Sequence, residues 1–213
     1  IPSKLFCSMN GNIRGHRDML WEQLVKHQLL NKYCSYLGRG VTIDIAPVMS
    51  EDKEAVQMND EETIASHTFP EFYKDILIDV VCETQVSQLF YTEKTWKPFL
   101  GERIPILIAP PGAYQQLKDW GFEEYTELFD YRFDLMADHE TRIESIVTQL
   151  KSLVEYEDPK QLYLKTKEKR EHNRENCLRL IKEQKDIPDL AYEDQTCLSI
   201  LGTIEERLTQ EKA

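Results

Sequence analysis

Short apolar runs alternate with amphipathic stretches along most of the chain. Three runs are almost continuously hydrophobic instead of alternating with polar residues: Lys4–Met9, Ile76–Thr84 and Ile104–Ala109. Continuous apolar runs of this length are typical of strands that are covered on both faces, as in parallel sheets. We therefore predict three buried strands here, and a further extended segment over Gly40–Val48.

Between these runs, apolar residues recur at helical spacing. They predict helices over His16–Lys32, Thr92–Gly101, Ala113–Trp120 and His139–Val154, and a short helix in "FPEFYKD". Gly121 follows the third of these helices and is expected to stop it in the left-handed conformation. Strands that alternate with helices indicate an α/β fold with a doubly wound, mostly parallel, Rossmann-like sheet.

The pattern changes after the predicted sheet. A long charged segment, Pro159–Glu183, predicts one helix with proline in its first turn, and an apolar cluster over Leu198–Ile204 predicts a last helix. We therefore divide the chain into a Rossmann-like domain, residues 1–156, and a C-terminal helical extension packed on it, residues 157–213. His172 and Asn173, in the long helix, are expected on a solvated face unless they meet a partner domain.

Composition narrows the classes of function. The 213 residues carry 38 acidic and 26 basic side chains, a net charge of −12, which disfavours nucleic acid as a partner. The five cysteines lack the spacing of a zinc site or a disulfide framework, so a reducing compartment, the cytoplasm, is expected. No apolar run has the roughly 18 to 20 residues of a membrane span.

Polar residues that could bind a ligand follow each predicted strand. In open parallel sheets, ligands bind at the carboxyl ends of the strands, where helix N-termini converge. These positions hold "SMNGNIRGHR", with Asn10, Asn12, Arg14, His16 and Arg17; "CETQVSQLFYTEK", with Glu83, Thr84, Tyr91 and Thr92; and "APPGAY", with Gly112.

A Glu93–Lys94 pair begins the predicted helix after the second strand. The carboxylate can accept both hydroxyls of a ribose, and the ammonium can neutralise a phosphate. A solvated surface ion pair is the commoner meaning of such a motif. Arg14 and Arg17 suit bidentate phosphate contact, but solvated arginines at a helix start are about as common. His16 could act as a base or donate a hydrogen bond to a phosphate, or could simply cap the helix.

Taken in order, these blocks resemble a known family. "FCSMNGNIRGHRDMLWEQL" followed by "YTEKTWKPFLGERIPILI" is similar to the nucleotide-sugar-binding half of GT-B glycosyltransferases, and most of all to the α-1,3-fucosyltransferases of glycosyltransferase family 10. Later blocks resemble a group of related glycosyltransferases. The matching residues are Phe6, Ser8, Arg17, Leu24, Tyr91, Thr92, Glu93, Lys94, Trp96, Gly101 and Pro105.

The resemblance implies a donor site. It assigns Glu93 to the ribose and Lys94 and Arg17 to the donor diphosphate, with Arg14 beside them and Asn10, Asn12, His16, Glu83, Thr84, Tyr91, Thr92 and Gly112 at the periphery. The family's Glu-Asn-Ser block is replaced here by "CETQVSQLF", so fucose is not assumed as the sugar. No residue is assigned as catalytic, because the base is expected from the other half of a GT-B enzyme, an N-terminal acceptor domain outside this chain.

The expected function is therefore transfer of a sugar, hexosyl or fucosyl, from a nucleotide-sugar to a hydroxyl of a glycan or another acceptor. No D-x-D motif occurs in the chain, so we expect neither a metal site nor a cofactor beyond the nucleotide-sugar. The alternative is a non-catalytic α/β module that binds a protein partner through its acidic surface. Asp130 and Asp134 could bind a sugar hydroxyl, although a local ion pair with Arg132 is the simpler expectation.

Overall fold

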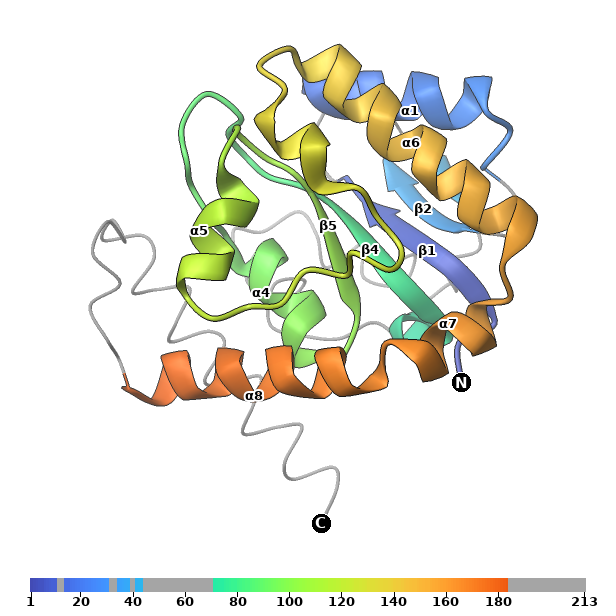
Figure 1. The fold of residues 1–213 in the computed structure, drawn as a ribbon. Coiled ribbons are helices and arrows are strands. Elements are labelled where there is room, and N and C mark those ends of the chain that lie inside the picture. Colours follow the sequence, from blue (N-terminus) through green and yellow to red (C-terminus); the bar gives the residue numbers. More distant parts are fainter. Residues whose placement is uncertain (11–13, 31–33, 39–40, 44–70, 184–213) are drawn as a thin grey trace, which may run out of the picture.

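The computed structural model describes residues 1–10, 14–30, 34–38, 41–43 and 71–183 (Figure 1). Five strands form one sheet in the order β3-β2-β1-β4-β5. β1 pairs in parallel with β2 and β4, β4 pairs in parallel with β5, and β3 is antiparallel to β2. The strands are β1 (Lys4–Met9), β2 (Cys34–Gly38), β3 (Val41–Ile43), β4 (Ile76–Cys82) and β5 (Ile104–Ile108). The fold is therefore α/β with a mostly parallel sheet, as predicted.

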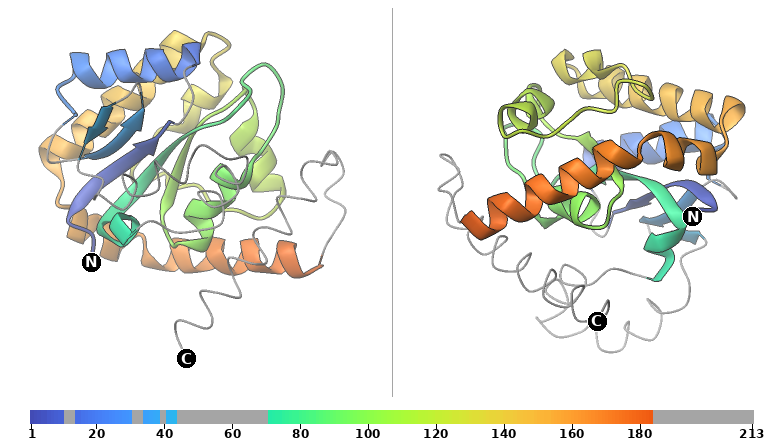
Figure 2. Two further views of the ribbon diagram at one scale, coloured as in Figure 1. Left: turned by 180° about the vertical axis from the view of Figure 1, so that it is seen from behind. Right: turned by 60° about the horizontal axis from the view of Figure 1, so that its bottom comes forward.

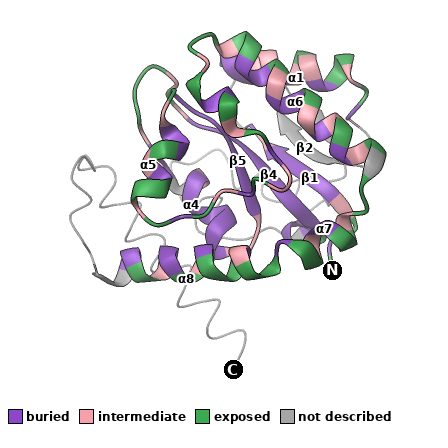
Figure 3. Cartoon of the chain, viewed as in Figure 1, coloured by how far each residue is buried: buried purple, intermediate pink, exposed green. Residues whose placement is uncertain are grey.

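The three predicted buried strands are confirmed as β1, β4 and β5. Every residue of β4 and β5 is buried, which is what continuous apolar runs require (Figure 3). Pro105 lies on β5, an edge strand, opposite Asp79 of β4. A missing N–H on the open edge of the sheet costs no hydrogen bond between strands. β2 was not predicted, and within the expected Gly40–Val48 segment only Val41–Ile43 lies among the described residues.

The helices confirm most of the predicted boundaries. They are α1 (Gly15–Lys26), α4 (Glu93–Leu100), α5 (Ala113–Asp119), α6 (His139–Tyr156), α7 (Pro159–Lys165) and α8 (Lys167–Glu183), with short 3-10 helices η1 (Glu71–Asp75) and η2 (Tyr131–Leu135). Gly121 has φ 89° just past α5, the left-handed stop expected there. The expected helix at Leu198–Ile204 lies outside the described residues.

Two helix predictions are wrong. α1 ends at Lys26 because Gln28 turns into the left-handed region, at φ 57°, and the amide of Leu29 then donates to the carbonyl of Leu24. This turn takes Leu29 into the core, where it is 2% exposed, instead of along the helix. The Pro159–Glu183 segment forms two helices, since Thr166 ends α7 and its hydroxyl donates back to the carbonyl of Leu162.

α8 is fastened to the sheet domain by buried polar groups. Asn173 is fully buried, accepts from the amide of Glu123 at 2.7 Å and donates to the carbonyl of the same residue at 2.9 Å. Arg170, 1% exposed, donates to the carbonyl of Glu102 and lies over the ring of Tyr163. The expectation of a solvated face at Asn173 is therefore wrong, because its buried side chain bonds both the amide and the carbonyl of Glu123.

The helices pack as two pairs. α1 and α6 lie side by side, and α4 packs against α8, in the view of Figure 1 and from behind in Figure 2. Because β1, β4 and β5 run in the same direction, their carboxyl ends meet at one edge of the sheet, toward the top of Figure 1. Among the described helices, none is long and apolar enough to cross a membrane.

Candidate functional site

The chain changes direction between β1 and β4. From β1 it passes through α1 to β2 on one side, and from β4 through α4 to β5 on the other side. Ligands of open α/β sheets bind outside the carboxyl ends of the strands at such a switch point. The residues that follow β1 and β4, and the first turns of α1 and α4, therefore define the candidate site.

α1 begins with a cluster of basic side chains. His16 and Arg17, 8% and 5% exposed, lie in its first turn and reach across to the end of β4. His16 Nε2 lies 2.9 Å from the carbonyl oxygen of Glu83, and an Arg17 terminal nitrogen donates to the carbonyl of Cys82 at 3.3 Å. Arg14, exposed, occupies the N-cap position and forms no side-chain cap bond. The sequence prediction that these residues gather at a strand end is consistent with this placement.

The surroundings of His16 favour its neutral form. Burial lowers its pKa, and the positive charges of Arg17, Arg14 and His139 lower it further, against the opposing effect of the Glu83 carbonyl. Since that carbonyl can only accept, Nε2 carries the proton and Nδ1 is the acceptor nitrogen of the neutral ring. His139, at the start of α6, has a buried Nδ1 without a partner in the described structure. The sequence reasoning did not identify His139, which is separated from α1 by over a hundred residues.

Glu83 fills the N-terminus of α4. Its side chain is fully buried, and its carboxylate accepts from the amide and hydroxyl of Thr92, at 3.0 and 2.8 Å, and from the hydroxyl of Thr95. The amide of Thr84 donates to the same carboxylate at 3.2 Å. A carboxylate at a helix N-terminus is favoured by the exposed N–H groups and the helix dipole. Glu83 therefore occupies, from within the chain, the kind of position that a ligand anion would take.

α5 is capped in the same way. Asp134 accepts from the amide of Tyr114 at 3.2 Å, and its backbone carbonyl accepts from the amide of Gly112. Burial raises the Asp134 pKa while the α5 amides lower it. Gly112 has φ 86°, a conformation that explains glycine there. Asp130 forms the predicted ion pair with Arg132, so the two acidic residues of "DYRFD" serve turn and cap geometry.

The remaining predicted site residues lie around the start of α4. Lys94 is half-buried in the first turn, where both its amide and its ammonium lie near the hydroxyl of Thr92, at 3.3 and 3.5 Å. Tyr91 is buried and donates its hydroxyl to the carbonyl of Ala113 at 2.7 Å, which makes it a link between loops. The side chain of Glu93 and the whole of Asn12 lie outside the described structure, so the predicted ribose contact stays a prediction.

Asn10 lies immediately after β1 and is 2% exposed. Its Nδ2 donates to the hydroxyl of Ser8 at 2.9 Å, and that hydroxyl donates to the carbonyl of Val80 on β4 at 3.0 Å. Its Oδ1 is buried and has no hydrogen-bond partner in the described structure. Ser8 thus links β1 to β4, and Asn10 is anchored to it through Nδ2 while its Oδ1 has no partner in the described structure.

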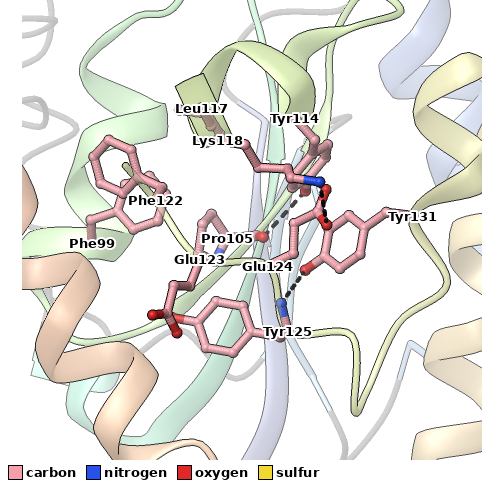
Figure 4. Close-up of a pocket in the computed structure, with 10 residues that line it drawn as sticks. All are labelled: Phe99, Pro105, Tyr114, Leu117, Lys118, Phe122, Glu123, Glu124, Tyr125 and Tyr131. Carbon is pink, nitrogen blue, oxygen red and sulfur yellow. Dashed lines mark hydrogen bonds and ion pairs between the residues drawn. The ribbon is translucent and has the colours of Figure 1, made fainter. Parts of the chain in front are cut away.

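A small cavity lies between α5 and the 122–131 segment (Figure 4). Its volume of about 10 Å³ holds one water at most. Aromatic rings line it, the hydroxyl of Tyr131 accepts from the amide of Tyr125, and Lys118 pairs with Glu124. It is a packing gap away from the strand ends. Within the described residues, no group of three or more His, Cys, Asp or Glu side chains is placed to hold a metal ion.

Comparison with known proteins adds no further constraint. No protein-family model, curated protein or solved structure matches the chain significantly. Functional inference therefore rests on the geometry at the carboxyl ends of β1 and β4.

Proposed function

We propose that the chain is the donor-binding domain of a nucleotide-sugar-dependent glycosyltransferase, and that it binds the donor diphosphate at the N-terminus of α1. The observation that carries the proposal is the contrast among the three helix starts at this edge. α4 and α5 are capped by Glu83 and Asp134, whereas no side chain of the described residues caps α1, whose start carries Arg14, His16 and Arg17. Uncapped N–H groups with nearby cations are what a diphosphate requires.

We further infer that the sheet is doubly wound. β2 and β5 lie on opposite sides of the β1–β4 pair, and crossovers between parallel strands are right-handed in nearly all proteins. Two right-handed crossovers that move in opposite directions place α1 and α4 on opposite faces. The contacts of α1 with α6 and of α4 with α8 agree with this arrangement.

Glu83 brings the two halves of the proposed site together. Its carbonyl accepts from His16, at the start of α1, and its carboxylate accepts from Thr92 and Thr95, at the start of α4. Lys94 is therefore held at the same edge of the sheet as Arg17. In the proposed complex both cations face the diphosphate, and Glu93, on the same turn as Lys94, is the residue expected to hold the ribose.

The proposed chemistry needs mainly charge stabilisation. An acceptor hydroxyl attacks the anomeric carbon, the bond from that carbon to the diphosphate oxygen breaks, and the leaving diphosphate carries away the electron pair. Fixed cations and helix N–H groups stabilise that developing charge. The base that takes the acceptor proton is expected from an acceptor-binding domain outside this chain. The buried cysteines Cys7, Cys82 and Cys177 are in the reduced state, which agrees with a reducing compartment such as the cytoplasm.

Calorimetric titration with a panel of nucleoside diphosphates tests the proposal. We expect one of them to bind, and Arg14→Ala and Lys94→Ala each to weaken it about tenfold, which corresponds to about 1.4 kcal/mol. Lys165→Ala, an exposed lysine in the last turn of α7, is the matched control and should bind as the wild type does. If no nucleoside diphosphate binds, the proposal is wrong and the alternative of a non-catalytic interaction module gains support.

A further inference from the structure

The amide of Asn10 has a fixed orientation. The hydroxyl of Ser8 uses its single proton on the Val80 carbonyl, so it can only accept from Asn10. The nitrogen of the amide must therefore face Ser8, and the oxygen is the atom that faces the other way. Ser8 lies within β1, whereas Asn10 directly follows that strand, at the carboxyl edge of the sheet where the switch point lies.

That oxygen has an unmet requirement. It is buried, with Asn10 only 2% exposed, and no donor of the described structure reaches it. An unsatisfied buried acceptor costs about 1 to 3 kcal/mol, so such an atom at a binding edge is an indication of a ligand group. The missing group must be a donor, which means a hydroxyl or an N–H.

A phosphate does not meet this requirement. The oxygens of an ionised diphosphate only accept hydrogen bonds, and the N–H groups of α1 and the guanidinium groups supply what they need. The same edge therefore presents donors on the α1 side and the buried acceptor Oδ1 of Asn10. A ligand that matches both carries a diphosphate and, beside it, a hydroxyl.

Resting on the proposed function, we propose that Asn10 is a specificity-determining residue, whose Oδ1 accepts a hydrogen bond from a hydroxyl of the nucleotide-sugar. The hydroxyl belongs either to the ribose or to the transferred sugar, and both present the same chemistry. Asn10 thus selects a glycosylated or ribosylated diphosphate over fully ionised inorganic phosphates, which lack the donor.

Two sets of ligands test the inference by calorimetry. The first compares the tightest-binding nucleoside diphosphate with its 2′-deoxy and 3′-deoxy forms and with inorganic pyrophosphate, on wild type and Asn10→Ala. If a ribose hydroxyl is recognised, Asn10→Ala weakens the parent ligand about tenfold and leaves pyrophosphate unchanged. One deoxy form should then bind wild type about tenfold more weakly and lose nothing further in Asn10→Ala.

The second set compares the nucleoside diphosphate with its nucleotide-sugar. If the transferred sugar supplies the hydroxyl, only the nucleotide-sugar loses affinity in Asn10→Ala. Ser8→Ala is the matched control: it removes the amide's anchor but keeps Oδ1, so it should weaken binding less than Asn10→Ala. The deoxy ligands on wild type need no variant and keep the test decisive if Asn10→Ala does not fold.

The outcomes separate the two proposals. Nucleoside diphosphates and nucleotide-sugars could bind with affinities that do not change when Asn10 and a ligand hydroxyl are removed. In that case the inference is wrong and the proposed function stands. A trapped water would then be the simpler partner of Oδ1. Equal losses for pyrophosphate and the hydroxyl-bearing ligands in Asn10→Ala would also overturn it. If none of these ligands binds wild type, both proposals fail.

Discussion

The first turns of α1 and α4 lie at the same edge of the sheet and differ in what occupies them. At α4, the chain supplies its own anion, Glu83, and two threonines saturate that carboxylate. At α1, no side chain of the described residues caps the helix, and Arg14 and Arg17 add positive charge. The fold itself therefore places a carboxylate at the α4 N-terminus, and the α1 N-terminus is the one left for the proposed diphosphate.

The two helix starts are also connected. The Glu83 backbone carbonyl accepts from His16 and the carboxylate of the same residue caps α4, so one buried residue fixes both. Glu83 is thus a positioning residue in this account. Loss of its side chain should disturb the start of α4, whereas the backbone carbonyl that accepts from His16 would remain.

The largest expected effect is on stability, in Glu83→Ala. Removing the carboxylate leaves the amide and hydroxyl of Thr92 and the hydroxyl of Thr95 without their acceptor in a buried site. We expect a loss of about 3 kcal/mol in the free energy of unfolding, measured by urea denaturation. Glu155→Ala, an exposed carboxylate on α6, should change it by less than about 0.5 kcal/mol. A loss at Glu83 as small as that of the control would contradict the capping role.

A second buried carboxylate, Asp79 on β4, caps no helix, and its ionised form should destabilise the fold instead of stabilising it. Burial raises the pKa of Asp79 to about 6, against the smaller opposing effects of its bonds from Tyr73 and Cys7 and of the charge on Lys97. The folded state therefore holds this proton more tightly than the unfolded state does, whose Asp pKa is 3.8. By linkage, this group lowers stability as the pH rises from about 4 to about 6.

The size of that effect follows from the shift. About two pKa units correspond to about 3 kcal/mol lost across the window. Asp79→Asn should abolish this contribution. The unfolding free energy of the variant should therefore rise relative to that of the wild type by up to about 3 kcal/mol between pH 4 and pH 7. A difference that stays constant with pH would contradict the shift.

Exchanging the caps should produce smaller and opposite changes. Thr92→Ala removes the N-cap of α4 and should cost about 1 kcal/mol. Arg14 has the extended backbone of an N-cap residue, so Arg14→Asp should cap α1 and stabilise the free chain by up to about 1 kcal/mol. The same variant should bind phosphate ligands at least tenfold more weakly. If Arg14→Asp keeps the wild-type affinity, the α1 site is wrong.

The smallest predicted change is in the protonation of His16. Its pKa should lie below the ordinary value of 6.5 in the free chain, because of burial and the charges of Arg14, Arg17 and His139. Sulfate at the start of α1 would offset those charges and raise that pKa, so sulfate binding should tighten as the pH falls toward it. NMR titration of the imidazole with and without sulfate measures both values. An unchanged pKa with sulfate bound would place the anion elsewhere.

Much of the fold follows from local patterns. The continuous apolar runs specify β1, β4 and β5, and helical spacing specifies α4, α5 and α6, because burial on both faces or on one face leaves a direct trace in the sequence. β2 leaves a weaker trace. Gln28 gives no signal that it will turn into the left-handed region and end α1 early, since this depends on where Leu29 finds the core.

The location of the candidate site can be predicted from the sequence, but its hydrogen bonds cannot. The rule that ligands meet strand ends places Asn10, Arg14, His16 and Arg17 together. Nothing in the sequence shows that Glu83 turns toward residues nine and twelve positions later, or that Asn173 meets the backbone of Glu123. Both depend on how loops pack once the sheet has formed. The sequence does not distinguish a polar residue that caps a helix from one that contacts a ligand.

The most direct test of the central claim is to follow backbone amide shifts by NMR during titration with pyrophosphate, and then with the best-binding nucleoside diphosphate. If α1 is the diphosphate site, the amides of Gly15 and His16 shift saturably, and those of Thr92 and Thr95, already bonded within the chain, shift little. Shifts centred on Thr92 and Thr95 instead, or none at either helix start, would contradict the account.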